Sequence, residues 1–419
     1  MKVFRGLRYK SRHMLMEIIK NNKIEIFFQP IVSIKNKRVF AFEALLRAYD
    51  NDGQVLSPVW LFEQAKKEEL SSMLDHRARL KAIEKFKPYY DENPKLLLFL
   101  NFESSSIERN FDLSQYIFVD KLLELGIPFK NIVLEVKEDE IENTKALKNF
   151  CRYYKNLGFN IALDDFGTGN SSFDRLSFIM PTVVKIDRSI IHNLDKNYIN
   201  AEILKAISKM CEKIGALVLA EGVESHAEIL ECMHGGVDLY QGYWFARPTL
   251  HFRDCALVNK RIEDLAMSFL KERSALGELK ENLLRRANRL TDKLLQVCAN
   301  GKSGNRGRLA RLVQNEKNVE AVYVIDAETS CQVGDTIINV EPRGFYEPSR
   351  AGEDHSLKEY VYMPKISKDA SHLTSSYISG ASGNICYTFS KKLFINHKEL
   401  IFCVDIYEEE EEKTGRYCA

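Results

Sequence analysis

The stretch FNIALDDFGTG spans residues 159–169, and TVVKID follows it at residues 182–187. In each stretch a short apolar run, of the length of a β-strand, is followed directly by charged side chains. In the first stretch the run ends in two adjacent acids, Asp164 and Asp165, and a glycine-containing turn follows at once. Two neighbouring carboxylates at such a turn reduce stability unless something neutralises them. The segment therefore predicts a buried strand with a site at its end.

Similar apolar runs recur on both sides of this stretch. They include IEIFFQPIVSI, LLLFLNF and NIVLEV before it and ALVLAEG after it, with helix-like segments such as Ala146 to Leu157 and Ile203 to Ile214 between them. Strands that alternate with helices form parallel βαβ units, and this many units between residues 23 and 255 predict a TIM-like (β/α)8 barrel of the α/β class. A doubly wound open sheet is the competing architecture, but no G-x-G-x-x-G turn follows an early strand.

The composition excludes several classes of protein. A chain of 419 residues, 45% of them hydrophobic, suggests two or more domains with a sizeable core. With 60 basic and 59 acidic residues the net charge is +1, which argues against a surface built for DNA. No apolar stretch approaches the about 20 residues of a membrane helix, and the basic N-terminus lacks an apolar signal core. The 9 cysteines are scattered without a CxxC pair. We therefore expect a cytoplasmic protein with free thiols and no membrane insertion.

Acidic and amide side chains stand at the ends of the apolar runs. The carboxyl ends of barrel strands all face one mouth, where active sites form. A ring of acids there repels itself unless cations are bound, and an all-oxygen ligand set favours Mg²⁺ or Mn²⁺ over Zn²⁺. Two such ions about 3.5–4 Å apart generate hydroxide and stabilise the leaving oxygen of a phosphodiester. The side chains concerned are Glu43, Asn101, Glu135, Asp164, Asp165, Lys185 and Glu221.

Each of these positions also has a plainer interpretation. A single acid at the end of a strand is commonly a helix cap or an ion-pair partner. Lys185 on its own fits a salt bridge inside the barrel, and the turn after Asp165 on its own fits a structural role. The joint pattern is what indicates a site.

The order of these motifs resembles one known family. Glu43-Ala44-Leu45 followed by Leu46-Arg47 is the signature that names the EAL phosphodiesterases, and the resemblance covers about residues 20 to 250. The other matching motifs follow in order: Phe28-Gln29-Pro30-Ile31, Asn101, Glu135, Asp164-Asp165-Phe166-Gly167-Thr168-Gly169, Lys185-Ile186-Asp187, Ala220-Glu221-Gly222-Val223-Glu224 and Gln241-Gly242-Tyr243. A match to all of them in order is very specific.

The resemblance implies a two-metal reaction that cuts cyclic di-GMP to the linear dinucleotide pGpG. Glu221 corresponds to the general base or water-orienting carboxylate, Lys185 to the group that holds the nucleophilic water, and Gln241 to a support of the water and metal shell. The residues that correspond to ligands of two Mg²⁺ or Mn²⁺ ions are Glu43, Asn101, Glu135, Asp164 and Asp165.

Further matched residues are implied to contact the substrate or to support a loop. Arg47 corresponds to a phosphate contact, which suits guanidinium geometry. Glu138 matches a glutamate that anchors the loop after Asp165, a loop that couples a dimer contact to the metals in this family. Gln29, Asp187 and Glu224 complete this outer set.

Three positions depart from the family pattern. Lys137 stands where threonine is usual, Asn170 where tyrosine is usual, and Phe173 where leucine is usual. None of them removes a metal ligand, so a competent site is expected, while the effect of the departures on the loop and on the basal rate stays open. No GGDEF-type cyclase signature occurs, so a synthase role is unsupported.

The rest of the chain divides into three parts. We expect residues 1–22 to form a basic leader or helix. Residues 256–300 form a helical linker, and residues 301–419 more weakly resemble an α+β sensor domain of the PAS or Cache-like kind, rich in β-branched strands such as VEAVYVID. Such a domain implies control of the barrel by a small-molecule signal that the sequence does not identify. Cys331, Cys386 and Cys403 in it lack metal-site spacing.

The linker carries apolar residues one heptad apart. They are Phe269, Leu276, Leu283, Leu290 and Val297, with Leu279, Ala287 and Leu294 as companions. This seam predicts either a coiled coil, and with it a homodimer, or a helix laid against its own barrel.

These observations predict a cyclic-guanylate-specific phosphodiesterase, a hydrolase whose substrate is cyclic di-GMP. The alternative is a catalytically silent cyclic di-GMP receptor that signals by conformation. Every matched position is filled, which favours the enzyme.

Overall fold

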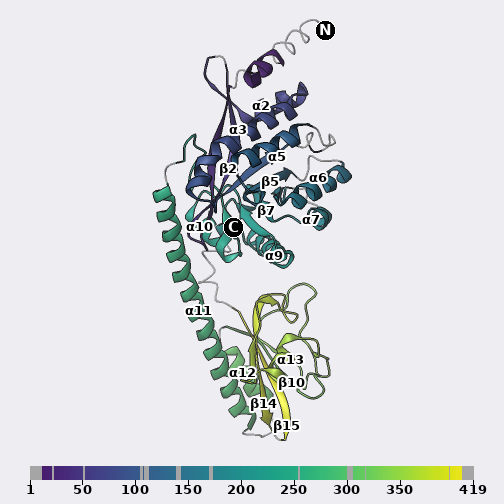
Figure 1. Cartoon of the computed structure of the whole chain (residues 1–419). Coiled ribbons are helices and arrows are strands. Elements are labelled where there is room, and N and C mark those ends of the chain that lie inside the picture. The colour runs from purple at the N-terminus through teal and green to yellow at the C-terminus, as the bar shows by residue number, and fades with distance from the viewer. Residues whose placement is uncertain are drawn as a thin grey trace. The chain divides into compact units, whose positions relative to one another are not determined.

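The computed structural model of the chain (Figure 1) describes residues 12–20, 23–50, 52–103, 107, 113–137, 143–168, 173–252, 255–299, 305–316, 318–395 and 397–407. The side chains of Leu276, Leu279, Leu283, Leu294 and Val297 lie outside this description. The chain divides into two compact units, Met1–Leu270 and Lys271–Cys418.

Eight strands of the first unit close into a barrel. Their order is β1-β9-β8-β7-β6-β5-β4-β2, and a further pairing of β1 with β2 closes the circle. The strands are β1 (Ile24–Ser33), β2 (Arg38–Tyr49), β4 (Leu97–Phe102), β5 (Ile132–Lys137), β6 (Asn160–Phe166), β7 (Val183–Ile186), β8 (Leu217–Ala220) and β9 (Leu239–Tyr240); the short β3 (Val55–Leu56) pairs with the end of β2. The prediction of a closed α/β barrel is confirmed.

One strand departs from the predicted all-parallel arrangement. β1 runs antiparallel to both of its neighbours, β2 and β9, whereas the pairs from β2 through β9 are parallel. The reason is the connection: β1 ends at Ser33 and β2 begins at Arg38. A connection this short can join only antiparallel strands, since a parallel crossover needs a dozen residues or more.

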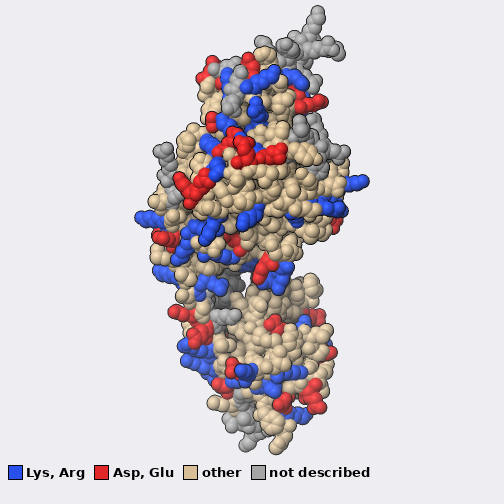
Figure 2. All heavy atoms as spheres, viewed as in Figure 1, with Lys and Arg blue, Asp and Glu red and all other residues tan. Residues whose placement is uncertain are grey.

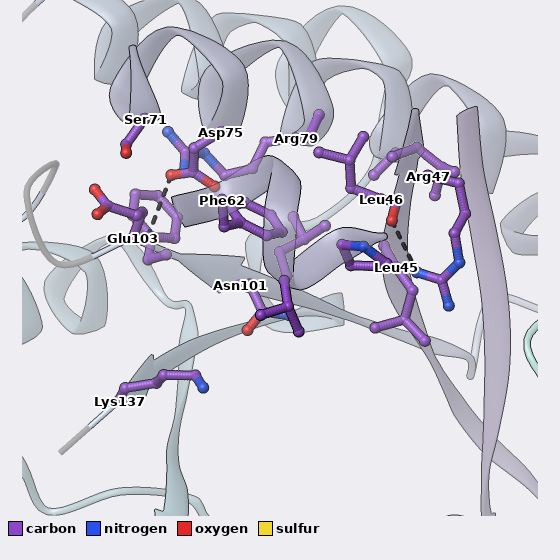
Figure 3. A pocket seen from close by; sticks show the side chains of 18 of the residues that line it. Leu45, Leu46, Arg47, Phe62, Ser71, Asp75, Arg79, Asn101, Glu103 and Lys137 are labelled. Atoms are coloured by element: carbon purple, nitrogen blue, oxygen red, sulfur yellow. Dashed lines mark hydrogen bonds and ion pairs between the residues drawn. The ribbon is translucent and has the colours of Figure 1, made fainter. Parts of the chain in front are cut away.

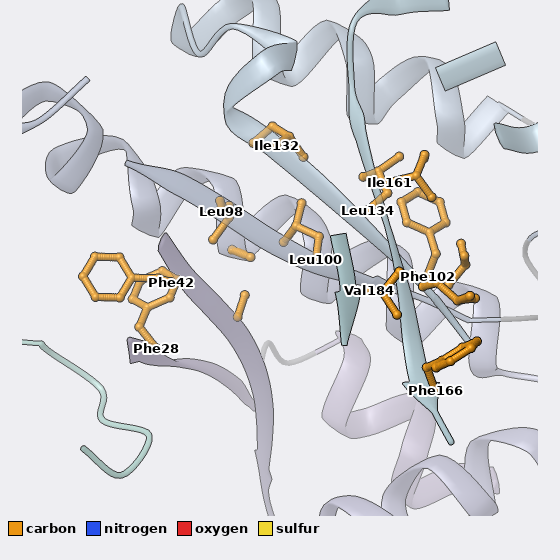
Figure 4. Close-up of a cluster of buried hydrophobic side chains, with 14 of the residues drawn as sticks. Phe28, Phe42, Leu98, Leu100, Phe102, Ile132, Leu134, Ile161, Phe166 and Val184 are labelled. Atoms are coloured by element: carbon orange, nitrogen blue, oxygen red, sulfur yellow. The ribbon is translucent and has the colours of Figure 1, made fainter. Parts of the chain in front are cut away.

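Helices pack around the strands. They are α2 (Pro58–Lys67), α3 (Ser71–Glu92), α5 (Leu113–Leu125), α6 (Thr144–Leu157), α7 (Phe173–Ile179), α8 (Arg188–Ile191), α9 (Tyr198–Ile214) and α10 (His226–His234), with short 3₁₀ turns at Phe129–Asn131 and Leu194–Lys196. α6 illustrates the local rule: it buries Leu147, Phe150, Cys151 and Tyr154 at helical spacing. Asn143 caps its first turn and Gly158 ends it in the left-handed conformation. Figure 4 shows the apolar layer that lies between strands and helices.

The predicted leader contributes to this core. Residues 12–20 are helical, and Leu15 and Ile18 are buried in the same cluster as the strand residues. Residues 1–11, 21 and 22 lie outside the described part of the chain.

The second unit is built on an antiparallel sheet. Its order is β11-β10-β15-β14-β12, with β13 paired to β14. The elements are α12 (Asn305–Gln314), β10 (Val319–Asp326), β11 (Ile337–Ile338), α13 (Glu359–Ile366), β12 (Ser371–Leu373), β13 (Tyr377–Ile378), β14 (Ile385–Ile395) and β15 (Lys398–Ile406). Val322, Phe389, Phe402 and Val404 form part of its core. This is α+β architecture; the likeness to PAS or Cache-like sensors stays a prediction.

The long helix α11 (Cys255–Ala299) belongs to both units. Val258, Ile262 and Leu265 are buried in the core of the first unit, whereas Ala287 and Leu290 are buried in that of the second. Phe269 also packs against the first core. The described side chains of the heptad seam therefore pack within the chain, and a homodimer through this seam stays a prediction.

Two broader features follow the composition. In the part of the chain that the structure describes, no helix combines the length and apolar character needed to cross a bilayer. The face seen in Figure 2 carries both basic and acidic side chains.

Candidate active site

The polar residues predicted from the strand ends form one layer on top of an apolar layer inside the barrel. The apolar layer takes one buried side chain from each strand: Ile31, Ala41, Phe99, Val133, Ala162, Val183, Leu219 and Leu239. Strand side chains alternate between the two faces, so the residue two positions further along points to the same side. Along the seven parallel strands these next residues are Glu43, Asn101, Glu135, Asp164, Lys185, Glu221 and Gln241. On β1, which runs the other way, the corresponding residue is Gln29, two positions earlier. The period of two thus brings these eight residues to the same mouth.

Lys185 lies at the centre of this polar layer. Its Nζ is 2.6 Å from Glu135 Oε1, 2.7 Å from Glu221 Oε1, 2.9 Å from Asp164 Oδ1 and 3.8 Å from Glu43 Oε1. The Lys185 side chain is 2% exposed and that of Glu135 is fully buried, while Glu221 is 20% exposed. One ammonium group therefore neutralises part of the charge of four carboxylates, and the excess is negative.

Burial and this mutual repulsion shift the pKa values of the cluster. Burial raises the pKa of Glu221 to about 8, against the opposing effect of Lys185. Burial also raises the pKa of Glu135 well above its ordinary value. For Lys185, burial lowers the pKa, but the attraction of Asp164, Glu135, Glu221 and Glu43 outweighs it, so the pKa lies well above its ordinary value. Lys185 is therefore held as a cation among acids that resist ionising together.

Gln241 joins the first strand to this cluster. Its Nε2 donates to Gln29 Oε1 at 3.2 Å and to Glu43 Oε2, and Gln29 Nε2 in turn donates to the carbonyl of Ala246 at 3.1 Å. Asn101 Nδ2 donates to Glu43 Oε1 at 3.3 Å. Gly242 makes the placement of Gln241 possible, because a Cβ there would lie 2.0 Å from the backbone oxygen of Val223.

The backbone is irregular where the two adjacent aspartates stand. The β6–β7 pairing shifts register between Leu163 and Phe166, and Asp165 has a φ of 56°. This left-handed conformation is uncommon for a residue with a side chain and is concentrated at functional sites. It sends consecutive carboxylates to one region: ligand oxygens of Asp164, Asp165 and Glu221 all lie within 4.8 Å of one another.

These residues fit a divalent cation on chemical grounds. The donors are carboxylate and amide oxygens, which hard cations such as Mg²⁺ and Mn²⁺ prefer. Oε2 of Glu135 and Oε1 of Gln241 are buried and accept no hydrogen bond from the described residues. Buried acceptors without a donor are costly, so they indicate a missing positive partner.

The residues predicted to contact the substrate or to support a loop have contacts of different kinds. Asp187 accepts a hydrogen bond from the Ser189 amide at 2.8 Å and caps α8. Glu224 pairs with Arg188 through both of its carboxylate oxygens. Glu138 lies outside the described residues. The structure therefore shows helix capping and a surface ion pair for two of these residues, and the sequence did not point to Arg188.

A pocket of about 500 Å³ opens beside Asn101 (Figure 3). The labelled side chains that line it include Arg47, Phe62, Asn101 and Lys137. Arg47 donates to the Leu46 carbonyl at 2.8 Å and its guanidinium lies 5.7 Å from the centre of the Phe27 ring. The pocket thus combines apolar and aromatic walls with cationic side chains, among them Arg47 and Lys137.

A buried ion pair that sequence analysis missed supports one wall of this pocket. Arg79 pairs with Asp75 one turn earlier on α3, and its guanidinium lies 3.8 Å from the centre of the Phe102 ring. Asp75 also accepts the Glu103 amide at 3.3 Å, which holds the chain that follows Asn101. The spacing of four residues between an acid and a base on a helix was the available signal.

The second unit buries a polar group of its own. Glu320, Cys386 and Asp405, from β10, β14 and β15, are buried with their ligand atoms within 4.8 Å of one another. Asp405 Oδ1 accepts from Thr388 at 2.6 Å and from Tyr323 at 3.2 Å, and Ser382 donates to Glu320 at 2.5 Å. Burial raises the pKa of Asp405 to about 7, with Glu320 adding to the rise.

This pKa predicts a pH-dependent stability of the second unit. The folded carboxyl keeps its proton up to about pH 7, whereas an unfolded aspartate ionises near 3.8, so stability falls as pH rises between these values. Asp405→Asn is neutral at every pH and should flatten the dependence. We expect calorimetric unfolding midpoints that differ little from the wild type near pH 4 and are higher by several degrees at pH 8. The exposed Asp369→Asn variant is the control, and an equal slope in all three proteins contradicts the prediction.

The fold and the site define a class of protein: a closed α/β barrel whose acid-ringed mouth offers oxygen ligands suited to a divalent cation. The EAL domain family matches residues 12–248, more than half of the chain, and the chain belongs to this family.

Similar proteins agree with this assignment. The EAL-domain containing protein YkuI of Bacillus subtilis is 23% identical over 338 residues, which cover 80% of this chain and 82% of that protein. The solved structure of YkuI, in complex with substrate c-di-GMP and calcium, superposes with a TM-score of 0.80 at 21% identity over 94% of this chain and 99% of that chain, which shows a shared fold. The cyclic di-GMP phosphodiesterase PdeA of Borreliella burgdorferi is 27% identical over 236 residues, covering 56% of this chain and 35% of that protein.

Proposed function

We propose that the chain is a phosphodiesterase that hydrolyses cyclic di-GMP to linear pGpG with the help of two Mg²⁺ or Mn²⁺ ions. The single observation that carries this proposal is the polar layer at the barrel mouth. In this layer Lys185 contacts Glu43, Glu135, Asp164 and Glu221. Asn101 and Gln241 donate hydrogen bonds to Glu43. The names of PdeA and of the YkuI complex add support for the dinucleotide, although the chain spans only 35% of the length of PdeA.

The proposed site divides the chemistry among its residues. Glu43, Asn101, Glu135, Asp164 and Asp165 would hold the metal ions, which supply a nucleophilic water at neutral pH and charge for the leaving oxygen. Glu221, beside Lys185 at 2.7 Å, is placed to accept the proton of the attacking water. Lys185 keeps Glu221 oriented and adds positive charge where the phosphodiester gains negative charge. Gln241 holds Glu43 in place.

The pocket beside this layer is the proposed substrate site. Arg47 and Lys137 supply positive charge for phosphate, and Phe62 supplies an aromatic wall for a base (Figure 3). In this proposal Asp187 and Glu224 do not contact the substrate. Asp187 caps α8 and Glu224 pairs with Arg188.

Turnover of cyclic di-GMP by the purified full chain tests the proposal directly. We expect pGpG to form with Mg²⁺ or Mn²⁺ and not in EDTA. Ca²⁺ should inhibit, because its larger and more flexible coordination suits a tight two-metal geometry poorly. Folded protein that binds cyclic di-GMP but forms no product with either metal would favour the alternative, a silent receptor.

Three further elements of the proposal concern assembly and control. A homodimer is supported by the heptad spacing in α11, and a cytoplasmic location by the sequence features given above. Control by a small-molecule signal is supported by the second unit, which has its own core and shares α11 with the barrel unit.

A further inference from the structure

Lys137 lies at the edge of the site, next to a carboxylate that could bind a metal ion. Lys137 is the last residue of β5 and stands two positions after Glu135, so the alternation of the strand directs both side chains to the barrel mouth. In the β5–β6 register Lys137 is the partner of Asp164. Its Nζ lies 2.8 Å from Oδ2 of Asp165.

The carboxylate that Lys137 contacts belongs to the oxygen cluster best suited to a cation. Asp164, Asp165 and Glu221 offer ligand atoms within 4.8 Å of one another. Lys185 already contacts Asp164 and Glu221, whereas Lys137 contacts Asp165 from the solvent side, with 43% of its own side chain and 36% of that of Asp165 exposed. A divalent ion on Asp165 would meet a positive charge already in place, and like charges at close range repel.

The same lysine also faces the proposed substrate site. Lys137 lines the pocket together with Arg47 and Asn101 (Figure 3). The flexible stem of a lysine allows its ammonium group to move between acceptors a few ångströms apart. A phosphate in this pocket is an alternative partner that leaves Asp165 free.

We propose that Lys137 acts as a built-in cation that competes with a divalent ion for Asp165, and that a substrate phosphate releases this competition by drawing the lysine away. Metal and nucleotide then strengthen each other's binding, because coupling between two sites is reciprocal. The proposal rests on the proposed function in taking a phosphodiester nucleotide as the ligand. It assigns Lys137 a positioning role, since the residue acts through Asp165.

Mn²⁺ binding to the full chain measures this competition without turnover. Free Mn²⁺ is followed by its electron paramagnetic resonance signal for the wild type, Lys137→Met, Lys137→Thr and the charge-preserving control Lys137→Arg. We expect the Met and Thr variants to bind one Mn²⁺ per chain about tenfold more tightly than the wild type and the Arg variant. Added pGpG, the proposed product, should tighten Mn²⁺ binding to the wild type and have a smaller effect on Lys137→Met. Thermal unfolding verifies that each variant is folded.

The outcomes separate this inference from the proposed function. Equal Mn²⁺ affinity and stoichiometry in all four proteins overturn the competition, and so does an equal response to pGpG. A gain of Mn²⁺ affinity in Lys137→Met supports it even if no variant forms product from cyclic di-GMP, a result that would count against the hydrolase alone.

Discussion

Glu221→Gln is expected to lower the rate of cyclic di-GMP hydrolysis by a factor of about 10² or more. Glutamine keeps the size and polarity of the side chain but cannot accept a proton from the attacking water. Glu221 stands at the end of β8, where Lys185 holds one carboxylate oxygen at 2.7 Å and where burial raises its pKa to about 8. A carboxylate with a raised pKa is a stronger base, and bound metal would keep it ionised at neutral pH.

Binding and catalysis should respond differently to this change. The dissociation constant of cyclic di-GMP, measured calorimetrically in Ca²⁺, is expected to change far less than kcat, because proton transfer contributes only in the transition state. Glu212→Gln, an exposed change on α9, is the matched control and should keep wild-type kcat. Near-normal turnover of Glu221→Gln with both Mg²⁺ and Mn²⁺ would show that another group accepts the proton.

The barrel and its central residues were predictable because one local rule governs both. In these strands a buried apolar residue is followed two positions later by a polar one, as in Val133 and Glu135 or Val183 and Lys185. Because side chains two positions apart point to the same face, this spacing predicts which polar side chain lies at the mouth of the barrel. Seven strands repeat this pattern in the same direction. The rule needs no knowledge of which strand lies next to which.

The features that were not predictable depend on contacts between distant segments. Whether Asp187 and Glu224 face the site or cap and pair elsewhere was decided by the α8 turn and by Arg188. The buried cluster of Glu320, Cys386 and Asp405 draws on three strands, and no spacing in the sequence reveals it. The short connection between β1 and β2 is typical of antiparallel strands. The alternation of strands and helices along the rest of the barrel predicted parallel strands throughout, and for β1 that prediction was wrong.

Lys185→Met in metal-free protein is expected to lower the free energy of unfolding by about 3–5 kcal/mol, the cost of leaving buried charges without their partner. The Lys185 side chain is 2% exposed, and its Nζ contacts Glu135, Asp164 and Glu221 within 2.9 Å. Methionine has similar length and fills the same space, so the loss reports charge rather than a cavity. Urea unfolding in EDTA measures it. Lys205→Met, which breaks an exposed pair with Glu202 on α9, is the control and should change stability by about 0.5 kcal/mol or less.

The loss in the free energy of unfolding caused by Lys185→Met, called the deficit below, should depend on pH and on metal, and this dependence identifies its origin. Without the ammonium group the clustered acids keep their protons to higher pH in the folded protein than in the unfolded chain, so the unfolded state releases protons and stability falls as pH rises. The deficit should therefore be small near pH 5 and larger at pH 8. Mn²⁺ supplies positive charge to the same oxygens and stabilises only the folded state, so it should restore more stability to Lys185→Met than to the wild type. A deficit that is independent of both pH and Mn²⁺ would mean that Lys185 acts through packing, and the charge-balance account of the barrel mouth would then be wrong.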